Sequence, residues 1–92
     1  MTANQQSVLY LSASKETFWL VVEPWANEFE IRPSQRCRLV AKNPKLMPRF
    51  EVEQEEGKLY AYVSEPGSTF EFWRDDKLEL DMPVPIPDTS TT

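Results

Sequence analysis

The sequence predicts an all-β fold: an antiparallel β-sandwich of seven or eight short strands, with a small β-barrel as the alternative. Three observations lead to this prediction. Apolar residues recur with a period of two in most segments, residues typical of turns separate those segments, and no stretch keeps a helical period long enough for a helix.

The first two predicted strands are the most continuously apolar. Residues 7–11 form a short apolar run, and residues 17–22 follow after a polar break. The second run is apolar on both faces, as expected for a central strand that is covered on each side. Pro24 ends it, because proline has no N–H to donate to a neighbouring strand.

The later strands alternate between apolar and polar residues, as half-buried strands do. They are predicted at residues 28–32, 36–42, 49–53, 59–63, 69–74 and 77–82. In the first three of them the core-facing side chains are predicted to be Phe29, Ile31, Cys37, Leu39, Ala41, Phe50 and Val52.

Short turns connect these strands. Gly57, within residues 54–58, is free to take a positive φ in a hairpin loop. Pro66 and Gly67 occupy the central positions of a type II turn, and Asp75-Asp76 suits a third hairpin because aspartate tolerates the left-handed region. Residues 31–36 are a looser fourth hairpin candidate.

One domain is expected. A chain of 92 residues can hold one modest core, which we assign to residues 1–82, and residues 83–92 are predicted to be a flexible tail rich in proline and hydroxyl side chains. The first residues show no signal-peptide pattern, and the apolar run 18–22 is too short to span a bilayer. A cytoplasmic protein without a membrane segment is therefore expected.

Composition excludes several chemistries. The chain has one cysteine, Cys37, and no histidine, so the usual zinc, copper and haem sites and Ser-His or Cys-His catalysis are excluded. Two glycines cannot make a glycine-rich phosphate loop, and a net charge of −5 argues against nucleic acid binding. We expect no cofactor and no metal, and no enzymatic activity, because the carboxylates fall at outward or turn positions.

A pattern around the second strand resembles a known group. Glu23-Pro24-Trp25, followed by Phe29, Ile31, Pro33-Ser34 and Leu39-Val40-Ala41, is similar to small bacterial β-proteins with a Glu-Pro-Trp turn. The stretch from Glu65 to Asp76 resembles their second half. The resemblance implies a β fold and no activity. The strand spacing also looks like a cupredoxin-like or immunoglobulin-like sandwich, although the histidine ligands of a cupredoxin are missing.

Five aromatic side chains are candidate binding residues: Trp19, Trp25, Tyr60, Tyr62 and Trp73. Trp25 either folds over the open end of the core, which we favour, or is an exposed anchor for a partner. The other four either belong to a second core face, which we favour, or form one aromatic patch that stacks sugars or bases or forms a dimer interface.

A basic stretch is the second candidate site. Arg32, Arg36 and Arg38 begin it, and two adjacent strands would align its charges as a docking face for an acidic partner or a phosphate group. The alternative, which we favour, is pairing with glutamates of outward parity such as Glu28, Glu30, Glu51 and Glu53.

The function that these observations favour is a non-enzymatic protein-interaction module. Its partner would be another protein or a second copy, bound through an aromatic sheet face. The alternative is a small-ligand or carbohydrate-binding domain that uses the same tryptophans and tyrosines.

Overall fold

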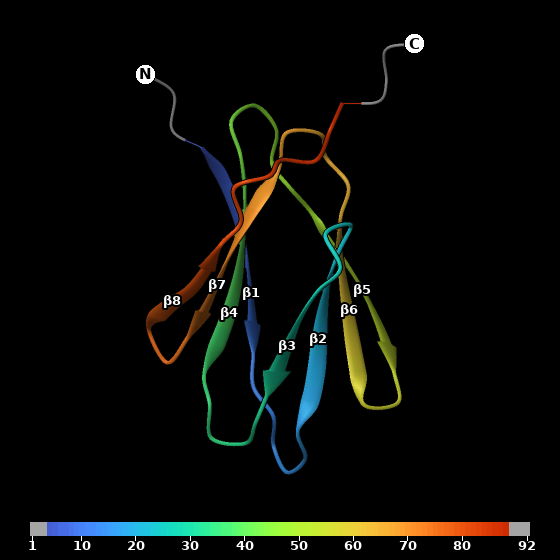
Figure 1. The fold of residues 1–92 in the computed structure, drawn as a ribbon, viewed down its shortest axis with the longest axis vertical. Coiled ribbons are helices and arrows are strands. Elements are labelled where there is room, and N and C mark those ends of the chain that lie inside the picture. Colours follow the sequence, from blue (N-terminus) through green and yellow to red (C-terminus); the bar gives the residue numbers. More distant parts are fainter. Residues whose placement is uncertain (1–3, 89–92) are drawn as a thin grey trace.

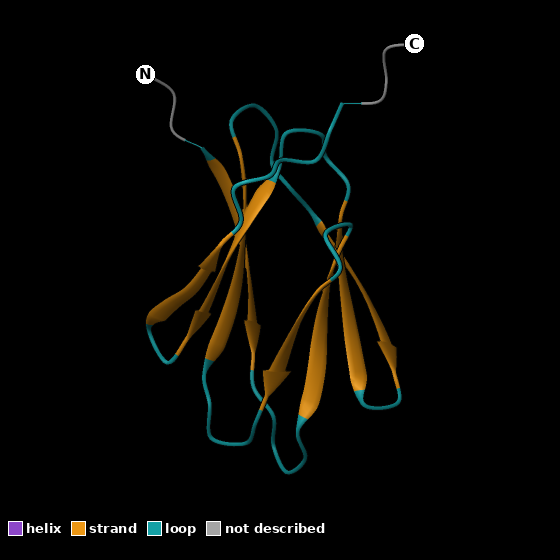
Figure 2. Cartoon of the chain, viewed as in Figure 1, coloured by secondary structure: helices purple, strands orange, loops and turns teal. Residues whose placement is uncertain are grey.

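The computed structural model describes residues 4–88, which form eight strands and no helix (Figures 1 and 2). The strands are β1 (Gln5–Leu11), β2 (Phe18–Glu23), β3 (Asn27–Ile31), β4 (Cys37–Asn43), β5 (Phe50–Glu55), β6 (Lys58–Val63), β7 (Thr69–Arg74) and β8 (Lys77–Asp81). Every predicted strand is present, and the bounds differ by one or two residues.

The strands form two four-stranded sheets, in the orders β1-β4-β7-β8 and β3-β2-β6-β5. The two sheets lie side by side in Figure 1, and successive strands run in opposite directions along the long axis. The predicted sandwich is confirmed, and the sheets do not close into the alternative small barrel. One pairing departs from a purely antiparallel pattern: β2 and β6 are parallel. Three strands (β3, β4 and β5) separate them in the sequence, and because each successive strand reverses direction, β6 runs the same way as β2.

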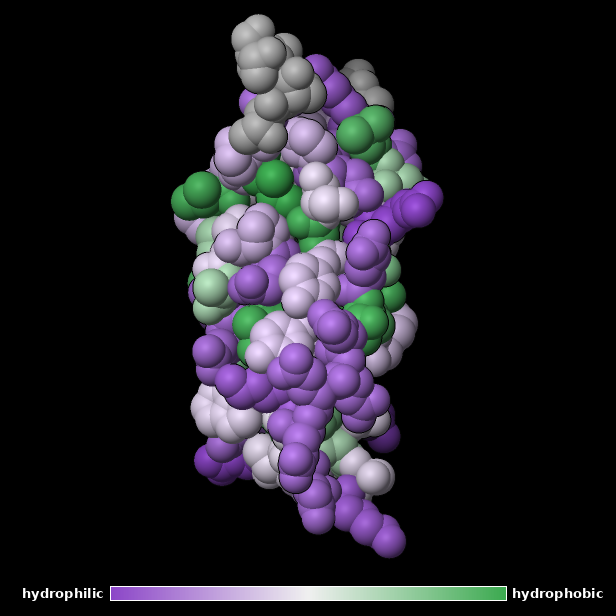
Figure 3. Space-filling view, turned by 90° about the vertical axis from the view of Figure 1, so that its right-hand side faces the viewer, coloured by the Kyte–Doolittle hydropathy of each residue, from purple (hydrophilic) through white to green (hydrophobic). Residues whose placement is uncertain are grey.

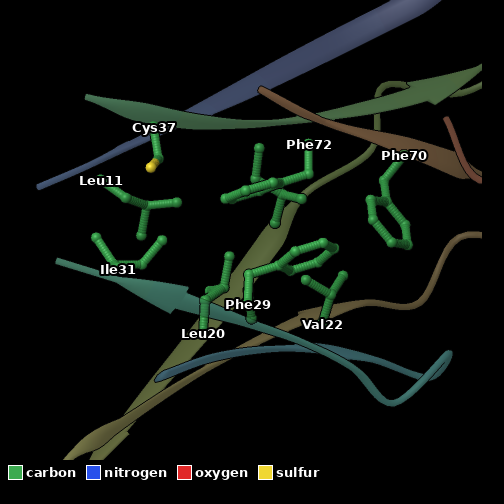
Figure 4. Packing of buried hydrophobic residues seen from close by; sticks show 10 residues of the cluster. Leu11, Leu20, Val22, Phe29, Ile31, Cys37, Phe70 and Phe72 are labelled. Carbon is green, nitrogen blue, oxygen red and sulfur yellow. The ribbon is translucent and has the colours of Figure 1, made fainter. Parts of the chain in front are cut away.

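Phenylalanine rings join the two sheets. The Phe29 ring of β3 stacks on the Phe72 ring of β7 with centroids 4.0 Å apart, and it meets the Phe70 ring edge to face at 6.3 Å. Figure 4 shows these rings between the sheets, surrounded by aliphatic side chains. The predicted inward positions of β3 and β4 are confirmed, because Phe29, Ile31, Cys37, Leu39 and Ala41 are all buried.

One predicted core residue is exposed. Val52 was expected to point inward with Phe50, but 49% of its surface is accessible. The reason is the position of its strand: β5 is an edge strand of its sheet, and beyond the half-buried Phe50 the opposing sheet does not cover its inner side.

Three of the predicted turns have the expected backbone. The fourth hairpin candidate, residues 31–36, was wrong, because the strands that it joins, β3 and β4, lie in different sheets. Gly57 and Gly67 have φ angles of 76° and 86°, and Asp75 and Asp76 have φ angles of 49° and 65° between β7 and β8. At Gly67 a side chain would be strained by that φ value, which favours glycine at the second central position of the Pro-Gly turn.

Trp25 covers one end of the sandwich. It lies in the short connection between β2 and β3, follows a cis Glu23–Pro24 peptide, and is half-buried. Its ring meets the Phe70 ring edge to face with centroids 4.8 Å apart, and its Nε1–H donates to the Val84 carbonyl at 2.7 Å. The favoured interpretation of Trp25 as a cover for the core is the one that these contacts support.

Residues 83–88, which the sequence assigned to a tail, cross this same end. Ile86 exchanges two backbone hydrogen bonds with the β6–β7 connection: its N–H donates to Ser68 and its carbonyl accepts from Gly67. Beside them the buried Asn43 amide donates to the Pro66 carbonyl and to Ser68 Oγ. Residues 89–92 of the expected tail lie outside the described residues.

Arg74 covers the opposite end. Its guanidinium donates to the Glu30 carbonyl of the other sheet at 2.7 Å and to Gln35 Oε1 at 2.6 Å, while its Nε donates to the Glu79 carboxylate at 2.7 Å. The hydrogen bond to Glu79 outweighs partial burial and raises the pKa of Arg74. In the described part of the chain there is no helix that is long and apolar enough to cross a membrane.

The Trp25→Ala variant should lose ~3 kcal/mol of unfolding free energy, because the ring covers Phe70 and bonds the C-terminal segment. Trp25→Phe should lose less, since it keeps a ring. Urea denaturation measures both, with Tyr10→Ala, a 78% exposed control, expected within about 0.5 kcal/mol of the wild type. An unchanged midpoint for Trp25→Ala would assign the ring a surface role instead.

Candidate functional site

The outer face of the β3-β2-β6-β5 sheet carries an aromatic stripe, which we define as Trp19 and Val21 of β2 with Tyr60 and Tyr62 of β6. The parallel pairing of the two central strands places Val21 beside Tyr60 and Glu23 beside Tyr62. The two tyrosine rings stack with centroids 6.3 Å apart. Trp19 is 41% exposed, whereas Val21 is only 6% exposed because neighbouring side chains cover it.

Two rows of glutamates flank the stripe on the outer strands of the sheet. On β3, Glu28 pairs with Val21 and Glu30 pairs with Trp19. On β5, Glu51 pairs with Tyr62 and Glu53 with Tyr60. The full set of outward glutamates on this face is Glu23, Glu28, Glu30, Glu51, Glu53 and Glu55.

Carboxylates of this set interact with Tyr62 and influence its pKa. The Tyr62 hydroxyl donates to Glu53 Oε2 at 3.3 Å. The pKa of Tyr62 is raised by partial desolvation and then by the negative charges of Glu53 and Glu23, which disfavour a phenolate. Figure 3 views the molecule from the side of this sheet and shows pale side chains at mid-height among both strongly hydrophilic and hydrophobic ones. The sheet register therefore places the aromatic stripe along the middle of the face and glutamates along its borders, with Lys58 of β6 as a cation between Trp19 and Glu55.

Trp73 lies on the other sheet. It points outward from β7, and the sheet register sets it beside Arg38 of β4. The Arg38 guanidinium carbon lies 4.3 Å from the centroid of the Trp73 ring, and Arg38 also pairs with Asp76 at 3.2 Å. Of the five candidate aromatics, the structure brings Trp19, Tyr60 and Tyr62 together, and it places Trp25 and Trp73 elsewhere.

The basic stretch does not form one face. Arg32 follows β3 and pairs with Glu30 at 2.6 Å, whereas Arg38 lies on β4 in the other sheet. Arg36 lies in the connection between these strands, where its N–H donates to Asp75 Oδ1 at 2.8 Å. The alignment of these charges by adjacent strands was a wrong expectation, because β3 and β4 belong to different sheets. Pairing with carboxylates was the better prediction, although only Arg32 uses a glutamate that was named for it.

Ion pairs neutralise the outer face of the β1-β4-β7-β8 sheet. Lys42 Nζ lies 3.0 Å from Glu71 Oε2 and 3.3 Å from Asp81 Oδ1, and the Trp73 Nε1–H donates to Glu71 at 2.9 Å. Burial opposes charge on Lys42, but its bonds to both carboxylates outweigh burial and raise its pKa. Burial likewise opposes charge on Glu71, but the bonds from Trp73 and Lys42 dominate and lower its pKa.

Neither the cysteine nor the carboxylates of the described residues form a reactive or metal-binding site. Burial raises the pKa of the Cys37 thiol, so it remains protonated and behaves as a small apolar side chain. Residues 4–88 contain no group of three or more histidine, cysteine or carboxylate side chains that could hold a metal ion. A groove of about 400 Å³ near one end of the stripe is lined by Glu23, Pro24, Tyr62, Val63, Ser64 and Ile86.

Val21 and the two glutamate rows are the parts of this face that sequence reasoning did not assemble. The signal for each was present, since Val21 shares parity with Trp19 and the glutamates alternate with core residues. The strand order that brings them together was not visible in the sequence. Comparison of the chain with protein-family models, with curated proteins and with solved structures finds no match.

The Glu71 carboxylate predicts a loss of stability in acid. Its folded pKa lies below the ordinary value of 4.5, so its stabilisation is present above pH 4.5 and is lost as the pH falls through the folded pKa. In Glu71→Gln the unfolding free energy should change less between about pH 7 and about pH 3 than it does in the wild type. Urea denaturation at both pH values measures this.

The control for this experiment is Glu16→Gln, an exposed loop variant, which should keep the acid dependence of the wild type. If Glu71→Gln and the wild type lose the same free energy in acid, the acid dependence comes from other groups.

Proposed function

We propose that this chain is a non-enzymatic protein-interaction module and that the aromatic stripe is its docking surface. The observation that carries the proposal is the position of the stripe. Its side chains lie on the two central strands of a sheet, and no element of residues 4–88 covers that outer face. Aromatic side chains with a charged border are the usual make-up of a protein interface, with anchors at the centre and polar groups at the rim.

The absence of buried acids supports a binding role over catalysis. A carboxylate pair that works as acid and base needs one buried member, and within the described residues the only buried polar side chains are Asn43 and Ser68. The alternative of a small-ligand or carbohydrate site needs a hollow lined by several aromatics. The groove beside the stripe is lined by only one of the candidate aromatic side chains, Tyr62.

The charge on this face favours a different protein over a second copy. A two-fold contact between two stripes would bring the glutamate rows of both copies together, and like charges across an interface are unfavourable. We propose a cytoplasmic location for this complex, in agreement with a single buried thiol that forms no disulfide.

Tyr60→Ala should strongly weaken partner binding while leaving the fold intact. The full chain is immobilised and exposed to an extract of its native cells, and the retained protein is quantified. We expect Tyr60→Ala to retain at least about tenfold less partner, because aromatic residues at interface centres dominate binding energy. Tyr10→Ala, which removes an exposed tyrosine from the other sheet, is the matched control and should retain as much as the wild type.

Equal retention of the partner by Tyr60→Ala and Tyr10→Ala would contradict the proposal. So would the absence of any retained protein on the wild type and on both variants. Analytical ultracentrifugation over a range of protein concentrations tests whether a second copy of the chain occupies the stripe. We expect a monomer, whereas a dimer that Tyr60→Ala dissociates would make a second copy the partner.

A further inference from the structure

The two outer faces of the sandwich differ in how many of their charged side chains form ion pairs. On the β1-β4-β7-β8 sheet, Arg38 and Lys42 are paired with carboxylates of the same chain. On the face with the aromatic stripe, only Glu30 of the six outward glutamates has an ion-pair partner in the described chain, namely Arg32. The other five are Glu23, Glu28, Glu51, Glu53 and Glu55. Lys58 of β6 lies in register between Trp19 and Glu55 and partly offsets the charge at that end of the face. The uncompensated negative charge therefore lies chiefly beside Val21, Tyr60 and Tyr62.

We infer that the partner presents an extended, arginine-rich segment that lies along the aromatic stripe between the two glutamate rows. This inference rests on the proposed function and names the chemistry of its partner. Cationic side chains would pair with the glutamates, and their apolar stems would cover the stripe, which a neutral or acidic segment cannot do.

The spacing of the two rows matches an extended chain. Alternate residues of one strand are separated by about 7 Å, so Glu51, Glu53 and Glu55 repeat at that interval along β5, and Glu28 and Glu30 do so along β3. Side chains on one side of an extended peptide repeat at the same interval. The rows lie on the first and fourth strands, which sets them about 14 Å apart and leaves room for one backbone between them.

The stripe favours arginine over lysine. The planar guanidinium stacks on aromatic rings and binds a carboxylate through two parallel hydrogen bonds, whereas the lysine ammonium is a strongly hydrated point charge. The other sheet already shows this arrangement within the chain: the Arg38 guanidinium stacks on the Trp73 ring and pairs with the Asp76 carboxylate. Tyr60 beside Glu53 offers the same combination to a guanidinium from outside.

The test is titration of the full chain into fluorescein-labelled hexa-arginine, followed by fluorescence anisotropy. We expect binding at about 20 mM salt that weakens at least about tenfold at about 150 mM, because exposed charge pairs are screened. Hexalysine should bind more weakly than hexa-arginine, and hexaglutamate should not bind.

Two variants and two matched controls localise the binding. Tyr60→Ala and the double variant Glu51→Gln/Glu53→Gln should each weaken hexa-arginine binding at least about fivefold. Tyr10→Ala removes a tyrosine from the other sheet, and Asp76→Asn/Asp81→Asn removes the same number of charges there. Both controls should bind within about twofold of the wild type, because surface charges far from a contact are screened. Circular dichroism melting confirms that all four variants are folded.

Two results would overturn the inference. One is the absence of hexa-arginine binding at low salt. The other is an equal effect of the two double variants, which would reduce the binding to a general attraction toward an acidic chain. In either case, the proposed interaction function would still be supported if Tyr60→Ala, and not Tyr10→Ala, lost the partner captured from the cell extract. If the capture experiment also failed, both proposals would be contradicted.

Discussion

The stacking of Phe29 on Phe72 is the contact on which the rest of this molecule depends. It joins β3 of one sheet to β7 of the other, and Phe70 extends it to Trp25 at the end of the sandwich. Because these rings define which face of each strand is inward, they also define which face is outward. The aromatic stripe faces outward because alternate residues of the same strands, namely Leu20, Val22 and Ala61, are committed to the core around these rings.

The ends of the sandwich are held by contacts of two kinds. Trp25 covers one end with an aromatic ring and one hydrogen bond to the segment that follows β8. Arg74 covers the other with a guanidinium that reaches a backbone carbonyl of the opposite sheet. Neither contact lies on an outer face, so both faces remain rigid supports built on paired strands. A docking surface on such a support loses little conformational freedom when a partner binds.

Much of the fold could be predicted because its determinants are local. Apolar runs located the first two strands and alternation the other six, and the Pro66-Gly67 and Asp75-Asp76 pairs marked turns whose positive φ angles the structure shows. Val52 was wrong because burial also requires an opposing layer, and β5 extends past that layer. The basic stretch was wrong as a face because strands that are neighbours in sequence lie in different sheets. The candidate site was only half predicted: Trp19, Tyr60 and Tyr62 lie on one sheet face, whereas Trp73 lies on the other sheet.

By itself the sequence determined the all-β architecture, the inward and outward parity of most strands, and the exclusion of histidine-dependent chemistry, because each of these follows from residue type or from neighbours along the chain. The tertiary structure alone decided that β6 lies parallel to β2 and that β3 and β5 become the outer strands of their sheet. Strand order depends on packing between residues far apart in the chain, which periodicity does not encode. That order turned scattered tyrosines and glutamates into one face with a single electrostatic character.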